Sequence, residues 1–273
     1  MTNYKRLPLE TLVNARDLGG FPLPNGATAF GRFIRSELPE RVSERDKTFL
    51  KDYGVTTSVD FRGSFEITES PSSLRGENWL RYIHSPLWSI EAAHGKPQLP
   101  AVTVIAEDVE PERFTEAQKA AHHRRKHERR LDSIEWVPVY IAMAEDNKDW
   151  VRKNFELFAE TEGCIHYHCM TGKDRTGVFT AMLLKAAGAA DDDVIADYAV
   201  SQIYLRPFYQ IFREGDPAFP GDPDLTLAFY ITAPDTMRGF LEHIHASYGS
   251  MRKYLTSCRL TEKTIDDALN GLI

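Results

Sequence analysis

A cysteine and an arginine with five residues between them stand in one short stretch of this sequence. The stretch reads HCMTGKDRTG over residues 168–177 and contains Cys169 and Arg175. A run typical of a strand precedes it at 164–168, and a helix-forming run follows at 178–185. A loop between a strand and a helix can turn its backbone N–H groups inward around an anion, and the positive end of the helix points at the same place. The spacing therefore indicates chemistry on a phosphate group through a thiol.

The electrostatic field of such a loop would activate the cysteine. Backbone N–H groups and a helix N-terminus favour the thiolate over the thiol, so we expect Cys169 to be a nucleophile near neutral pH. A guanidinium can grip two phosphate oxygens at once, and Arg175 is expected to do so. The expected reaction has two steps, attack of Cys169 on phosphorus to give a phosphocysteine and attack of water on that intermediate. Because the loop already supplies a positive field, no metal ion or other cofactor is expected.

An acid is also needed, because the leaving oxygen must be protonated. Asp174 stands next to Arg175 and close to both the expected thiolate and a dianionic substrate. Negative charges nearby favour the protonated form of a carboxyl group, so Asp174 could hold the proton and later act as the base. The alternative is that Asp174 only braces Arg175 or the loop backbone. Asp174 is the first candidate for the general acid, and Asp60 is the second.

The other residues of the loop are expected to bind the phosphate or to shape the loop around it. Lys173 adds positive charge, which suits a polyanionic substrate, and Thr176 could donate a hydrogen bond to the cysteine sulfur. Glycine permits tight backbone curvature, which explains Gly172. Met170 and Thr171 complete the predicted substrate-binding residues through the backbone N–H groups of the loop.

Polar residues outside the loop are a second source of candidates. Asp60 and Arg62 lie at the end of a buried strand predicted at 55–61, and would emerge at the carboxyl edge of the sheet, where ligands bind in open α/β folds. Both are therefore candidate substrate-binding residues, while structural pairing or helix capping explains them equally well. Arg16 and Asp17, in the turn-rich sequence NARDLGG, are expected to brace neighbouring loops rather than to take part in catalysis.

The composition is ordinary for a globular protein and excludes some partners. The 273 residues include 33 basic and 40 acidic side chains, and the net charge of -7 argues against nucleic acid as a partner. Three cysteines, an odd number, indicate a reducing compartment. No apolar run resembles a signal peptide or a membrane span, so we expect a cytoplasmic protein without an integral membrane segment. The basic segment at 115–131 is first explained as a solvated helix face, and otherwise as a patch for peripheral contact with a membrane or a phosphoinositide head group.

Apolar and turn-forming residues predict an α/β fold in which strands and helices alternate. Strands are predicted at 30–35, 55–61, 79–86 and 164–168. Helices are predicted at 43–53, 115–131, 134–144, 149–160, 178–187 and 196–213, with another starting at 191 and three short ones between 234 and 273. We expect one domain over 1–273, with a loop-rich insertion at about 88–132 and a segment that could form a lid at about 199–233.

Together with NARDLGG at 14–20, Arg35-Ser36 and DFR at 60–62, the loop resembles that of the atypical bacterial tyrosine phosphatases with dual protein and phosphoinositide activity. The resemblance runs from about residue 12 to the tail. It implies a cysteine-dependent phosphatase fold, which is a central and mostly parallel sheet flanked by helices, with helical insertions. It also implies that Cys169 is the nucleophile, that Arg175 clamps the phosphate, and that Asp174 is the general acid inside the loop.

The resemblance leaves the substrate open among phosphotyrosine, phosphoserine or phosphothreonine, and phosphoinositides. Lipid phosphatases of the animal tumour-suppressor type have a similar loop with two lysines. This sequence has Lys173 but Met170 at the other lysine position, which weakens a lipid preference. Two other classes compete: a rhodanese-like sulfurtransferase, whose loop is typically shorter, and a non-enzymatic phosphate-binding module, which would be expected to lack Cys169 or Arg175.

Overall fold

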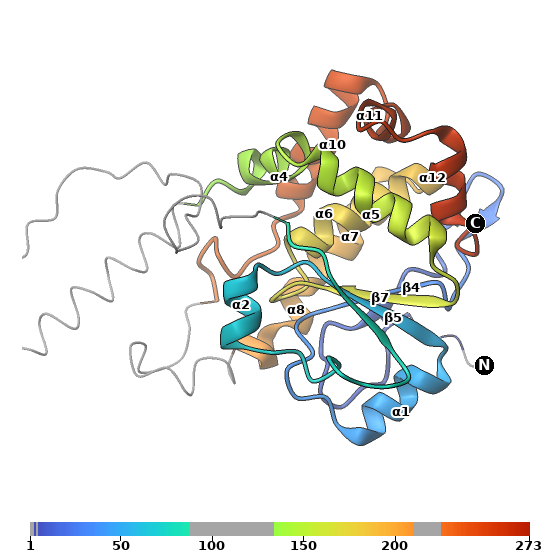
Figure 1. Ribbon diagram of the computed structural model, residues 1–273. Coiled ribbons are helices and arrows are strands. Elements are labelled where there is room, and N and C mark those ends of the chain that lie inside the picture. Colours follow the sequence, from blue (N-terminus) through green and yellow to red (C-terminus); the bar gives the residue numbers. More distant parts are fainter. Residues whose placement is uncertain (1–2, 4, 88–133, 210–224) are drawn as a thin grey trace, which may run out of the picture.

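The computed structural model describes residues 3, 5–87, 134–209 and 225–273 (Figure 1). The predicted insertion at 88–132 and the basic segment inside it lie outside the described residues. The same holds for the middle of the predicted lid segment, from 210 to 224.

A five-stranded sheet forms the centre of the molecule, in the order β1-β4-β7-β5-β6. Its strands are β1 (Arg16–Asp17), β4 (Phe33–Ser36), β7 (Cys164–His168), β5 (Val55–Asp60) and β6 (Arg81–His84). β4, β7, β5 and β6 are parallel, and β1 runs antiparallel along β4 at the edge. The expected α/β class with a mostly parallel sheet is therefore confirmed. Outside this sheet, β2 (Pro22–Leu23) and β3 (Gly26–Ala27) form a small hairpin.

Apolar residues cover both faces of the sheet, as parallel strands require. Ile165 and Tyr167 of β7 point into the larger core, and Cys164 points into the smaller one. Figure 1 shows most of the helices on one side of the sheet and α1 (Glu44–Asp52) on the other. The helices on the side opposite α1 are α4 (Trp136–Glu145), α5 (Lys148–Glu160), α6 (Arg175–Ala187), α7 (Asp191–Ala199), α10 (Pro234–Tyr248), α11 (Met251–Ser257) and α12 (Glu262–Leu269).

Local sequence signals explain where several helices begin and end. The hydroxyl of Ser43 accepts the backbone N–H of Asp46 and caps α1, as predicted from the serine at this position. α6 stops at Gly188, whose φ of 100° is left-handed and suits glycine. The three predicted tail helices are present, and the first ends at Gly249. None of the helices among the described residues is both long and apolar enough to cross a membrane.

One helical prediction needs correction, and one helix was not predicted. The single helix predicted at 196–213 is interrupted at Val200 and Leu205, so that up to residue 209 it consists of the end of α7, a short α8 (Ser201–Tyr204) and helical residues at 206–209. A helix that the sequence did not predict, α2 (Ser64–Glu69), follows directly after β5. Its N-cap is Gly63, which has no side chain to signal a helix start; instead the Glu66 carboxylate accepts the Gly63 N–H at 2.8 Å.

Candidate active site

The loop of Cys169 begins where the central strand ends. In the register of the sheet, Ser36, His168 and Asp60 stand side by side at the carboxyl ends of β4, β7 and β5. Cys169 follows immediately and is 1% exposed. α6 starts six residues later, at Arg175. The loop therefore occupies the carboxyl edge of a parallel sheet, where ligands bind in folds of this type.

Three consecutive carbonyl groups of the loop accept hydrogen bonds from residues outside it. The Met170 carbonyl accepts the Leu38 N–H at 2.9 Å. The carbonyls of Thr171 and Gly172 accept side-chain donors, Asn14 Nδ2 at 3.0 Å and Arg35 Nη2 at 2.6 Å. In a trans peptide the C=O and the next N–H point in opposite directions, so these bonds turn the following N–H groups toward the inside of the loop. This is the arrangement that binds an anion.

Gly172 is required by the shape of the loop. Its φ is +66°, and a Cβ atom at this position would lie 2.1 Å from the carbonyl oxygen of Ser36. No other residue could adopt this conformation without moving β4 or the loop. The prediction that this glycine permits tight curvature is confirmed.

A buried network holds the loop from behind. Asp197 of α7 accepts Arg16 Nε at 2.8 Å on one oxygen and Arg35 Nη1 at 2.7 Å on the other. Although burial favours the protonated acid, the two guanidinium groups keep the pKa of Asp197 below its usual value. Arg16 also bonds the side chain of Asn14, which in turn bonds the loop. The expected bracing role of Arg16 is confirmed.

Arg175 is held by a carboxylate that sequence reasoning missed. Its Nη1 and Nη2 atoms lie 2.6 Å and 2.7 Å from the two carboxylate oxygens of Glu66, on α2. Burial works to lower the pKa of Arg175, but Glu66 and the sulfur of Cys169 outweigh it and raise that pKa. The only signal for Glu66 in the sequence is its place three residues after Gly63, which fits the capping pattern of a helix start.

Asp174 is partly exposed and is held by a tyrosine. Its side chain is 19% exposed, and its Oδ1 atom lies 3.7 Å from Lys173 Nζ. Tyr140 of α4 donates its hydroxyl to the same oxygen at 2.7 Å, and the Tyr198 hydroxyl lies 2.9 Å from that of Tyr140. Burial and then the charge of Asp174 raise the pKa of Tyr140 well above its usual value, so this hydroxyl remains a donor. Neither tyrosine carried a signal in the sequence beyond its type.

Lys173 points away from solvent. The residue is 1% exposed, and its Nζ atom donates to the carbonyl of Phe229 at 2.5 Å. The ammonium also lies over the rings of Trp136, at 4.7 Å, and Phe229. Burial lowers the pKa of Lys173. The Lys173 side chain thus links the loop to the segment at 225–232, and its ammonium is covered by aromatic rings. The sequence instead led us to expect a solvent-accessible ammonium that could bind a polyanionic substrate.

The hydroxyl of Thr176 is buried and forms no hydrogen bond with the described residues. The expected bond to the sulfur of Cys169 is therefore not formed in the free protein. A buried donor without a partner is costly, and such atoms at a site commonly meet a ligand or an intermediate.

Asp60 and Arg62 pair with each other. Both side chains are 0% exposed, and Arg62 Nη2 lies 2.7 Å from Asp60 Oδ2. Tyr82 donates to the same oxygen at 2.6 Å, and His168 lies 3.6 Å away. Burial alone would raise the pKa of Asp60, but His168 and Arg62 lower it to about 2. Arg62 also donates to the carbonyl of Ser70 just past α2. These contacts match the structural alternative, in which the pair anchors the helix that carries Glu66.

The arrangement suits attack on a bound phosphate and contains no evident metal site. Within the described part of the chain, no group of three or more His, Cys, Asp or Glu side chains is placed to hold a metal ion. The charges of the site come from Arg175, the loop N–H groups and the helix end behind them. Such fixed donors stabilise the charge of a phosphoryl group during transfer.

Comparison with known proteins agrees with this chemistry. A tyrosine-protein phosphatase of Nostoc commune is 23% identical over 247 residues, which cover 85% of this chain and 71% of that protein. A putative tyrosine-protein phosphatase of Cupriavidus necator is 27% identical over 253 residues, which cover 91% of this chain and 82% of that protein. A family model described as the tyrosine phosphatase family matches residues 7–272. Because that match takes in every described strand and helix, the chain belongs to the tyrosine phosphatase family.

Proposed function

We propose that this protein hydrolyses phosphotyrosine in proteins through a phosphocysteine on Cys169. The observation that carries the proposal is the loop between β7 and α6, in which outward-bonded carbonyls turn the N–H groups inward beside a buried cysteine. The names of the two relatives support tyrosine as the phosphorylated residue.

In the first step the Cys169 thiolate attacks phosphorus and the bond from phosphorus to the tyrosine oxygen breaks. The loop N–H groups and Arg175 bind the three equatorial oxygens as their charge develops. Glu66 occupies two of the five N–H donors of the Arg175 guanidinium, and the other donors are available to phosphate. The bidentate pair fixes the orientation of the guanidinium before substrate arrives, so little freedom is lost on binding.

Asp174 supplies the proton to the leaving oxygen in this step. Its partial exposure leaves it accessible, and the bond from Tyr140 fixes the position of one carboxylate oxygen. In the second step the same carboxylate takes a proton from water, which attacks phosphorus and releases the cysteine sulfur as a thiolate. The unpartnered hydroxyl of Thr176 is available to stabilise that thiolate.

The surroundings of Lys173 favour phosphotyrosine over a phosphoinositide. The ammonium is bonded to the Phe229 carbonyl and covered by rings, and Met170 contributes no second charge. A head group with several phosphates would need free cations around the loop. Phosphoserine and phosphothreonine are the other competing substrates. Because Cys169 is buried, the longer side chain of phosphotyrosine should reach it more easily than the shorter side chains of phosphoserine and phosphothreonine.

The proposal is tested by comparing purified wild-type protein with Cys169→Ser. Phosphotyrosine peptides, phosphoserine peptides and a short-chain phosphoinositide are offered at equal concentrations, and released phosphate is measured. We expect hydrolysis of phosphotyrosine that vanadate inhibits, that EDTA leaves unchanged, and that Cys169→Ser abolishes. Cys258→Ser is the matched control, because it removes a buried thiol far along the chain in the tail.

A rapid acid quench during turnover should trap a phosphorylated peptide that contains Cys169. Hydrolysis that persists in Cys169→Ser would contradict the thiol mechanism. A protein that binds vanadate but hydrolyses none of these substrates would instead be a phosphate-binding module. Faster hydrolysis of the phosphoinositide than of every peptide would overturn the substrate assignment alone.

A further inference from the structure

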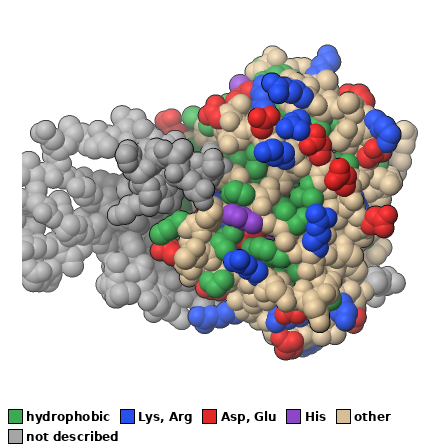
Figure 2. All heavy atoms as spheres, in the orientation of Figure 1, with side chains coloured by type: hydrophobic (Ala, Val, Ile, Leu, Met, Phe, Trp, Pro, Cys, Tyr) green, Lys and Arg blue, Asp and Glu red, His purple; other side chains and the backbone are tan. Residues whose placement is uncertain are grey.

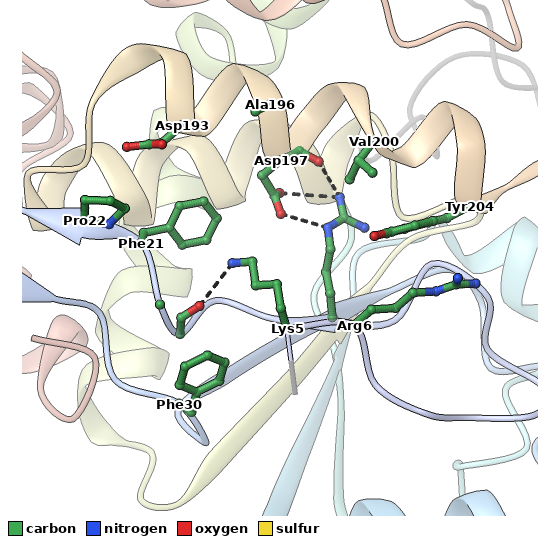
Figure 3. A pocket seen from close by; sticks show the side chains of 13 residues that line it. Lys5, Arg6, Phe21, Pro22, Phe30, Asp193, Ala196, Asp197, Val200 and Tyr204 are labelled. Carbon is green, nitrogen blue, oxygen red and sulfur yellow. Dashed lines mark hydrogen bonds and ion pairs between the residues drawn. The ribbon is translucent and has the colours of Figure 1, made fainter. Parts of the chain in front are cut away.

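A hollow lies beside the network that holds the loop, and Arg16 and Asp197 of that network line it (Figure 3). It has a volume of about 400 Å³ and lies between the N-terminal segment, the turn after β1 and the helices α7 and α8. This volume is within the usual range for pockets that bind small molecules. Its residues include Lys5, Arg16, Phe21, Phe30, Asp197 and Tyr204.

Lys5, in this hollow, forms no ion pair with any residue that the structure describes. The Nζ atom of Lys5 donates to the Gly19 carbonyl at 3.2 Å and lies 3.3 Å from the centre of the Phe21 ring. The described residues place no carboxylate within ion-pair distance of it, and both oxygens of Asp197 are already taken by Arg16 and Arg35. Lys5 is an exposed residue, yet partial desolvation of its ammonium among these neighbours lowers the pKa of Lys5 to about 8, an effect that Asp197 opposes. An anion beside this ammonium would recover the lost charge stabilisation.

Aromatic rings form the walls around this cation. Phe21 and Phe30 lie on one side of Lys5 in Figure 3, and Tyr204 lies on the other. The guanidinium of Arg6 lies over the Tyr204 ring, 4.3 Å from its centre, and adds a second positive charge at the opening. Walls of this kind suit a flat apolar body, while the cations suit one negative group.

The floor of the hollow is fixed before any ligand binds. Arg16 is held by Asp197 and by Asn14, and both partners also belong to the network behind the catalytic loop. The N–H groups of Arg16 are taken by Asp197, Asn14 and Ser201, so Arg16 contributes a fixed surface rather than a free charge. A side chain held in place loses little conformational freedom when a ligand binds against it. Asp193, at the edge of the hollow on α7, would repel a second negative charge on the ligand.

We propose that this hollow is a binding site for a small organic monoanion with a flat apolar body. The negative group pairs with the Lys5 ammonium above Arg16, and the apolar body lies against Phe21, Phe30 and Tyr204. The site is separate from Cys169 and does not depend on the catalytic proposal. Nothing in the chemistry of the hollow cleaves or modifies the ligand.

Calorimetric titration with 2-naphthoate tests this site. The titration is carried out on Cys169→Ser, so that no turnover interferes, and on wild-type protein saturated with vanadate, so that the catalytic loop is occupied. We expect saturable binding of one 2-naphthoate in both samples. Lys5→Met keeps the length of the side chain and removes its charge, and should weaken binding by about tenfold or more. Lys263→Met is the matched control, because this lysine side chain is 82% exposed on α12 and lies outside the hollow.

Further ligands and variants distinguish the contribution of the charge to binding from the contribution of the apolar walls. The neutral amide of the same ring system, 2-naphthamide, should bind at least about tenfold more weakly than 2-naphthoate to the unmodified hollow. Phe30→Leu, at a partly exposed ring, should weaken 2-naphthoate while leaving the preference for the anion. Lys5→Arg should restore part of the affinity that Lys5→Met loses. A thermal melt of each variant shows whether it is folded.

Several results would overturn the proposal. They are absence of saturable binding to the folded protein, equal affinity in Lys5→Met and wild type, and displacement of 2-naphthoate by vanadate, which would place it in the catalytic loop. Because binding is measured without turnover, failure of the hollow and failure of the phosphatase proposal give different results. If the protein showed no phosphatase activity but still bound 2-naphthoate, the proposal for this binding site would be supported.

Discussion

The start of α6 and the end of β5 each place a carboxylate near the loop, in opposite surroundings. Asp174 is 19% exposed and accepts a hydrogen bond from the neutral hydroxyl of Tyr140. Asp60 is 0% exposed and is paired with the guanidinium of Arg62. The two residues were the sequence candidates for the same role, the general acid. Their environments now separate them.

The difference shows how surroundings assign roles to chemically equal groups. A proton carrier must reach the leaving group and exchange its proton at working pH. Asp60, with a pKa of about 2, stays ionised at working pH, and its negative charge is paired with the guanidinium of Arg62. That pair anchors α2, where Glu66 holds Arg175. Asp60 therefore supports the helix that carries Glu66, and Asp174 is left as the candidate for the proposed general acid.

The largest effect is expected for Asp174→Asn. Loss of a general acid costs about a hundredfold to ten-thousandfold in rate, but only where the leaving oxygen needs a proton. We expect a fall of that size with a phosphotyrosine peptide and a much smaller fall with an activated aryl phosphate. The measurement is kcat for both substrates. Equal losses on both would assign Asp174 a structural role and remove the contrast with Asp60.

Asp60→Asn should act on stability more than on chemistry. Removing one charge from a buried pair leaves Arg62 uncompensated, which we expect to cost about 3 kcal/mol in the free energy of unfolding. Urea denaturation measures this loss, and Asp267→Asn, at a 47% exposed side chain, is the control. The ratio of kcat for the two substrates should stay as in wild type. A leaving-group dependence like that of Asp174→Asn would make Asp60 the acid after all.

The pH dependence of stability should report the same pair. The pKa of Asp60 is about 2 in the folded protein and 3.8 in its ordinary state, so its contribution is fully present above the higher value and is lost as the pH falls through the lower one. We expect about 2 kcal/mol of the difference between wild type and Asp60→Asn to disappear between about pH 4 and about pH 2. Urea denaturation at a series of pH values measures it. A difference that does not change over this range would contradict the lowered pKa.

The smallest effect is expected for Tyr140→Phe. This change removes the hydrogen bond to Asp174 and keeps the ring, so it should cost about tenfold in kcat, or about 1.4 kcal/mol. Tyr140 acts through Asp174, so the loss should be seen with phosphotyrosine and hardly at all with an activated aryl phosphate, and KM should change little. In Asp174→Asn, the added Tyr140→Phe should have almost no further effect. Additive losses would show that the tyrosine acts independently.

The strongest sequence predictions concern residues that are neighbours in the chain. Strand β7, the loop and α6 are contiguous, so one run of apolar residues, one spacing and one helix-forming run could indicate them together. All four predicted strands of the parallel sheet are present with slightly different ends, because β-branched and apolar residues favour the buried strands of such a fold. The edge strand β1 is only two residues long and had no such signal.

The predictions that fell short concern partners that only folding brings together. Glu66 lies 109 positions from Arg175, and Tyr140 lies 34 positions from Asp174. No local pattern links such residues, and α2 is a six-residue helix capped by a glycine. Lys173 is part of the motif, yet its direction depends on the Phe229 carbonyl and on Trp136. Its residue type alone favoured a free charge.

By itself, the sequence determined the loop that we propose to be catalytic, since the cysteine, the glycine and the arginine stand on a backbone turn that ten adjacent residues can specify. It also determined the class of the fold, because the periodicity of apolar residues sets which segments can be buried. Only the tertiary structure decided which carboxylate is the better candidate for the proposed general acid and which one holds an arginine. That choice depends on burial and on the nearest charge, and both come from segments that are distant in the chain and meet only when the core has formed.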